Sequence, residues 1–134
     1  MRIWIATLIL LTHGLSSADD VYQTATIYSP IDIANIEQYE VRKELYLLDD
    51  VRSVLDYKLI SQQYIGQPQL WRHRIDGLVP NIGYSKASHW AMLHLHNTAD
   101  HEIYRSISLD TTTLDMVDFY VLKPDDETQF YSAG

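Results

Sequence analysis

The stretch from Asn81 to Leu122 alternates between apolar and polar side chains, and this alternation restricts the folds open to the chain. Within it, the run His89–Asn97 has two unlike sets of side chains: Ala91, Leu93 and Leu95 in one, and Trp90, Met92, His94 and His96 in the other. Side chains two residues apart on an extended backbone share a face, so a period of two predicts a strand. The apolar set is expected to face the core.

Further runs alternate in the same way. Ile103–Leu109 and Met116–Leu122 each place apolar residues on one face, while Glu44–Asp50 and Thr128–Ser132 have the composition of shorter strands. A strand with one apolar face needs a second layer to cover that face. The sequence therefore predicts an all-β domain, in the form of an antiparallel β-sandwich.

The part before residue 80 is more mixed. Val21–Tyr28 alternates weakly and predicts a strand or an extended arm, and Ser29 followed by Pro30 predicts the start of a short helix. Val51–Ile60 has apolar residues at helical spacing. Trp71 lies in an irregular stretch, where a Trp is expected to anchor the loop in the core.

Residues 1–18 have the pattern of a secretory signal peptide. Arg2 gives a positive start, Ile3–Leu11 forms an apolar run, and Ser16 and Ala18 are small residues at the positions that a signal peptidase reads. The apolar run is shorter than the roughly 20 residues that a membrane-spanning helix needs. The pattern predicts an exported protein cut before Asp19, and it excludes residues 1–18 from the fold of the mature domain.

Charge narrows the partners. The formal net charge is −8 over 134 residues, which argues against binding to a nucleic acid or to an anionic membrane. The chain has no cysteine, so neither a disulfide framework nor thiol chemistry is available to it.

Several short motifs, in their order and spacing, carry a family resemblance. The chain shows LYLLDD from residue 45, then NIGYSKASHW, LHLHN and LDTTTLDMVDFYVL, which ends at residue 122. In this order the motifs resemble the type 2 extracellular domain of bacterial seven-transmembrane receptors with diverse intracellular signalling modules. Two departures are clear: Met92 stands where the family usually has Arg, and the family carries further strands beyond the last motif.

The resemblance implies an organisation and a fold. It implies residues 19–43 as an N-terminal arm with a short helix and residues 44–134 as a partial sensor domain. The implied fold is a jelly-roll sandwich similar to carbohydrate-binding modules, in the periplasm. In the family such a domain precedes seven membrane helices and an output module such as a histidine kinase or a diguanylate cyclase, and its ligand is a carbohydrate or a related small molecule.

Aromatic residues suggest where a sugar would bind. Trp90, Tyr84 and Tyr120 can form a platform for the C–H face of a sugar ring, with hydrogen bonds from polar neighbours such as His94 and His96. On this hypothesis Trp90→Ala weakens binding without unfolding the domain. The alternative is that Trp90 is a core residue, since large aromatic side chains dominate core packing.

The polar candidates have alternatives too. The His-x-His spacing of His94 and His96 occurs in metal sites, but without a third ligand it favours a polar or pH-responsive face, and no metal or cofactor is expected. Arg105 is a candidate fork donor to a ligand or a partner in an ion pair. The carboxylates considered for glycosidase or calcium chemistry are Asp110, Asp115 and Asp118.

These observations favour a non-enzymatic, exported domain that binds a small ligand as the sensor part of a receptor. A stand-alone carbohydrate-binding module and a jelly-roll glycoside hydrolase remain the alternatives. Continuation of the gene into seven apolar spans would favour the receptor, and activity on glycosides that depends on Asp118 would favour the hydrolase.

A first prediction concerns association. A sandwich that lacks strands leaves a sheet edge and part of an apolar face uncovered. We therefore expect the isolated chain to form homodimers or larger assemblies, or to be marginally stable. Light scattering and thermal melting check this, and a dispersed monomer with a cooperative melt would contradict it.

Overall fold

The fold is described from a computed structural model, which covers residues 2–11, 21–78, 88–108, 116–124 and 127–133; of residues 2–11 only the backbone is considered. The strands are β1 Arg2–Leu11, β2 Tyr22–Thr24, β3 Ile31–Asp32, β4 Tyr46–Asp50, β5 Arg72–Arg74, β6 Ser88–Asn97, β7 Met116–Leu122 and β8 Thr128–Ala133. Short helical segments are η1 Ile33–Asn35, α1 Tyr57–Leu59, η2 Ile60–Tyr64 and η3 Pro68–Leu70.

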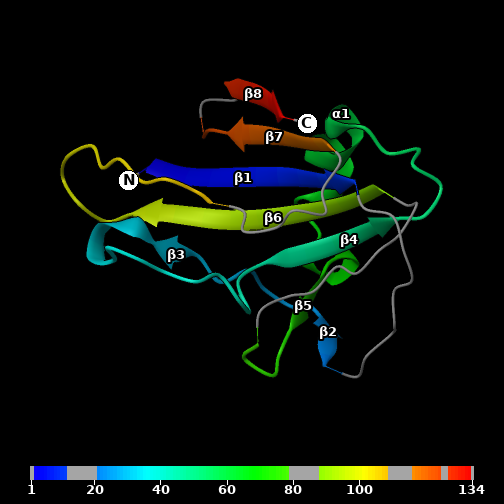
Figure 1. Cartoon of the computed structure of the whole chain (residues 1–134), viewed down its shortest axis with the longest axis horizontal. Helices are drawn as coiled ribbons and strands as arrows, with labels where there is room; N and C mark the ends of the chain where they lie inside the picture. Colours follow the sequence, from blue (N-terminus) through cyan, green and yellow to red (C-terminus); the bar gives the residue numbers. More distant parts are fainter. Residues whose placement is uncertain (1, 12–20, 79–87, 109–115, 125–126, 134) are drawn as a thin grey trace.

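The strands form one continuous sheet. Its order is β2-β5-β4-β6-β1-β7-β8, and β3 pairs with the last part of β6 (Figure 1). The β3–β6 bridge is parallel, and the other pairings are antiparallel. The all-β prediction is confirmed, whereas the jelly-roll arrangement stays a prediction.

Strand β1 lies in the middle of this sheet. It pairs with β6 from Arg2 opposite Asn97 to Leu11 opposite Ser88, and on its other side with β7. Figure 1 shows β1 in blue between β6 and β7. The sequence analysis excludes this segment from the fold as part of a signal peptide. Its removal stays a prediction, but in the full chain the segment is a central strand.

The face of the sheet that carries Trp90 is covered by the helical segments. Trp90 and Met92 of β6 and Tyr46 of β4 are almost fully buried, and they pack in one cluster with residues from outside the sheet: Ala25, Ile60, Ile65 and Trp71. We call this side the covered face. Trp71, 1% exposed, donates from Nε1 to the carbonyl of Tyr64 at 2.9 Å, which fits the predicted anchor in the core.

A buried carboxylate positions the helical cover. Asp50 ends β4, is 4% exposed, and accepts hydrogen bonds from the backbone N–H groups of Val54 and Leu55 at 3.0 and 2.8 Å. Asp56 then accepts from the N–H of Leu59 at 2.8 Å, which caps the helix. The sequence predicts helix from Val51, but the helix begins at Tyr57 because the preceding residues follow the Asp50 turn.

The opposite face is also packed near the start of β6. Leu47 and Ala91 are buried there and contact Val117 and Phe119 of β7. Strand β6 is therefore covered on both faces from His89 to Leu93. The expectation that one face of this strand is core and the Trp90 face is open is wrong for these residues.

Two local predictions also fail. Residues 103–108 of the predicted strand Ile103–Leu109 form no strand, and Tyr104 is 86% exposed. The expected helix start at Ser29 is replaced by a short helix η1, which Asp32 caps by accepting from the N–H of Ala34 at 3.0 Å. Alternation in a short exposed stretch is thus a weak indicator of a strand when no neighbouring strand pairs with it.

The burial of Trp90 leads to a stability prediction. We expect Trp90→Ala to lower the free energy of unfolding by about 3–5 kcal/mol, because it leaves a large cavity in the covered face. Urea denaturation of the purified chain measures this. Tyr104→Ala is the matched control and should change stability by less than about 0.5 kcal/mol. Equal stability of both variants would contradict the core position of Trp90.

Candidate functional site

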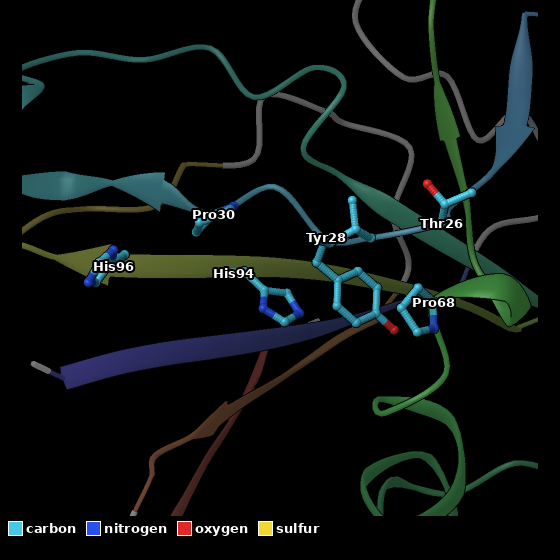
Figure 2. Close-up of a pocket in the computed structure, with 7 residues that line it drawn as sticks. Thr26, Tyr28, Pro30, Pro68, His94 and His96 are labelled. Atoms are coloured by element: carbon cyan, nitrogen blue, oxygen red, sulfur yellow. The ribbon is translucent and has the colours of Figure 1, made fainter.

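A cavity opens beside the second half of β6. It has a volume of about 460 Å³ and lies between β6 and the segment 26–30, which we call the arm. Its lining residues are Thr26, Ile27, Tyr28, Pro30, Pro68, His94 and His96. Figure 2 shows His94 and His96 on β6, Tyr28 lying over His94, and Pro68 next to Tyr28. We call this cavity the arm pocket.

Hydrogen bonds hold the arm in place. The hydroxyl of Tyr28 donates to the carbonyl of Ile65 at 2.6 Å, and the N–H of Ser29 donates to the hydroxyl of buried Tyr46 at 2.6 Å. Both bonds are non-local, with 37 and 17 residues between the partners. They fix one wall of the arm pocket before any ligand arrives.

The arm is also attached to the end of β6. Asp32 pairs with His96 in the β3–β6 bridge, and its Oδ2 accepts from the hydroxyl of Thr98 at 2.7 Å. This hydrogen bond and the one from the N–H of Ala34 hold the pKa of the Asp32 carboxyl below its usual value. The carboxylate thus stays charged in mild acid and keeps the arm attached.

The centre of the site is a pair of stacked rings. The Tyr28 and His94 rings lie 4.3 Å apart between centroids with an interplanar angle of 28°, and Tyr46 meets Tyr28 edge-on at 5.0 Å. Burial raises the pKa of Tyr28 and lowers the pKa of His94 to about 4. Both groups are therefore neutral at neutral pH, and the charge change of His94 falls below the mild-acid range expected for a pH-responsive site.

Two nitrogens in this site lack partners. The Nε2 atoms of His94 and His96 are buried and make no hydrogen bond within the described part of the chain. A buried polar atom without a partner costs about 1–3 kcal/mol, so a ligand that supplies a hydrogen bond there gains affinity. A neutral imidazole carries one donor and one acceptor nitrogen, so these residues can bind hydroxyl groups.

The other predicted contacts lie elsewhere. Trp90 is 1% exposed and is part of the core, which favours its structural alternative. Tyr120 lies on the same face, half-buried, with its ring stacked on Tyr57 at 4.3 Å. Arg105 is exposed and donates to the carbonyl of Tyr104, away from the arm pocket. Tyr84 lies outside the described residues.

The acidic candidates form no evident centre in the described chain. Asp118 of β7 accepts a hydrogen bond from the hydroxyl of Ser132 at 2.6 Å, whereas Asp110 and Asp115 lie outside the described residues. Among the residues with described positions, no three His, Asp or Glu side chains come together in a way that could hold a metal ion.

Sequence reasoning missed the arm. His94 and His96 were candidates because they share a strand face, but nothing in the local pattern connects Tyr28 or Pro68 with them. The connection depends on the parallel bridge of Ile31 with Leu95, which joins segments 64 residues apart. An N-terminal Tyr in an arm of weak alternation was the one available signal.

Comparison with known proteins gives one finding. A family model described as 7TMR-DISM extracellular 2 matches residues 42–134. No curated protein sequence and no solved structure matches the chain. No helix of the described residues is long and apolar enough to cross a membrane.

The buried state of His94 leads to a pH prediction. Its pKa is about 4 in the folded chain and near 6.5 when unfolded, so between these values the unfolded chain binds more protons. We therefore expect stability to fall as pH falls through this window, by at most about 1.4 kcal/mol per pH unit. Urea midpoints at several pH values measure this.

His94→Phe is the matched variant for this measurement, because it keeps a ring against Tyr28 and removes the titrating group. Its stability should depend less on pH between 4 and 6.5 than that of the unchanged chain. Parallel pH profiles of the two proteins would show that His94 titrates normally.

Proposed function

The chain belongs to the 7TMR-DISM extracellular 2 family, and we propose that it is the periplasmic sensor domain of a seven-transmembrane signalling receptor that binds a small, uncharged, saccharide-like ligand in the arm pocket. The observation that carries the proposal is the pair of buried, unpartnered imidazole nitrogens in a cavity whose wall is already in place. The role is binding without catalysis, followed by a signal through membrane helices to an intracellular output module.

The lining supports an uncharged ligand. The described residues of the arm pocket include no Lys, Arg, Asp or Glu, and His94 is neutral at neutral pH. A charged ligand would lose its hydration there without gaining an opposite charge. The chain's net charge of −8 further disfavours anions.

The mixture of surfaces supports a saccharide-like molecule. Tyr28, Pro30 and Pro68 offer apolar surface, and the two imidazoles offer hydrogen bonds. Sugars need both, because their C–H faces pack on apolar rings while their hydroxyls need partners. The volume of about 460 Å³ falls in the usual range for small-molecule sites, roughly 300–1,000 Å³.

The hydrogen bonds of the arm support a rigid site. Because Tyr28 and Ser29 are tied to Ile65 and Tyr46, little conformational freedom is lost when a ligand binds. Movement of the arm relative to β6 would be the natural response to a ligand, since the arm contacts both the helical cover and the sheet.

The proposal predicts the effect of one substitution. A panel of neutral mono- and disaccharides is screened against the chain by ligand-observed NMR, and the tightest binder is titrated by calorimetry. We expect His94→Phe to raise Kd about tenfold, because it keeps the ring and removes the hydrogen bond. His101→Phe, at an exposed position outside the pocket, is the matched control and should leave Kd unchanged.

Two results would contradict the proposal. One is binding of a saccharide that His94→Phe does not weaken, which would locate the ligand elsewhere on the domain. The other is absence of binding across the neutral panel together with binding of charged small molecules, which would contradict the uncharged ligand class.

A further inference from the structure

Strand β1 is the single link between two parts of the sheet. In the described strand order, β6 and β7 each pair with β1 and have no pairing with each other. All ten residues of β1 pair with β6, and the seven from Ile5 to Leu11 pair with β7 as well. The segment is therefore hydrogen-bonded along both edges, as a central strand is.

The sequence of this segment suits two incompatible roles. RIWIATLILL is almost continuously apolar, which is typical of a strand covered on both faces and equally of the apolar part of a signal peptide. A segment engaged by the export machinery and then cut off cannot stay between β6 and β7. Folding of the full chain and export through this segment therefore compete.

The two flanking strands remain attached to the domain by other contacts. Tyr120 of β7 stacks on Tyr57 of α1 and lies 6.3 Å from the Trp90 ring of β6, centroid to centroid. The hydroxyl of Tyr57 also lies 3.1 Å from Oγ1 of Thr128 in β8. These contacts hold the β7–β8 hairpin at its distance from β6 without any contribution from β1.

Direct closure of the sheet is disfavoured. Because β1 is antiparallel to both neighbours, β6 and β7 run parallel to each other, two strand spacings apart, or roughly 10 Å. To pair directly, β7 would have to move by about one strand spacing, roughly 4.8 Å, and break the Tyr57–Tyr120 stack. A site that keeps its width and two open edges can accept a strand again.

We infer that the space between β6 and β7 is a strand-acceptor site, and that residues 2–11 occupy it as an exchangeable strand rather than as a permanent part of the domain. The site takes an extended apolar segment of about ten residues, antiparallel to β6 and β7. This inference concerns the sheet and does not rest on the proposed ligand.

The test uses the full chain. A protease recognition sequence is inserted between Ser16 and Ser17, the folded protein is cut there, and a fluorescent synthetic peptide of residues 2–11 with a solubilising lysine tail is added in excess. We expect the labelled peptide to replace the original segment and to reach one peptide per chain in size-exclusion chromatography.

The matched control is the same peptide with Thr7→Pro. Thr7 lies in the middle of β1, opposite Met92 on one side and Tyr120 on the other. Proline has no N–H group and is excluded from central strands, so this peptide should incorporate at least tenfold less. Failure of the unchanged peptide to incorporate, or equal incorporation of both peptides, would overturn the inference.

Discussion

The structure depends on the backbone pairing of β6, which has hydrogen-bonded neighbours along its whole length. Strand β1 pairs along one edge, and β4 and then the short β3 pair along the other. This central position explains why His89 to Leu93 are buried on both faces. It also explains why the last part of the strand, which only β3 and the arm cover, is where a cavity forms.

The arm pocket is a consequence of how β6 runs out of cover. Towards Asn97 the helical segments no longer lie over the sheet, and Tyr28 covers His94 in their place. Stacking on Tyr28 removes water from His94 and lowers its pKa to about 4, so the imidazole acts as a neutral hydrogen-bonding group. The proposed ligand class follows from this neutrality more than from the shape of the cavity.

The acceptor site and the arm pocket lie on the same strand, and β1 connects them. His94 stands opposite Ile5 and His96 opposite Ile3 in the register of β1, so the backbone of the exchangeable strand borders the part of β6 that carries both imidazoles. An exchange of the strand between β6 and β7 would therefore reach the proposed ligand site. This links the fate of the N-terminal segment to the proposed sensing role.

The sequence by itself determined the all-β class, the strands around His89–Asn97 and Met116–Leu122, the anchoring of Trp71 and the family. These depend on side-chain period and motif order, which are local properties. The placement of Trp90 in the core, of Tyr28 over His94 and of residues 2–11 in the sheet was decided only by tertiary structure. Each depends on a partner distant in the chain: α1 and η2 cover Trp90, the β3–β6 bridge carries the arm to His94, and β6 with β7 encloses β1. An alternating pattern shows that a strand has two unlike faces, but the segment that covers each face is set by long-range pairing that no local pattern records.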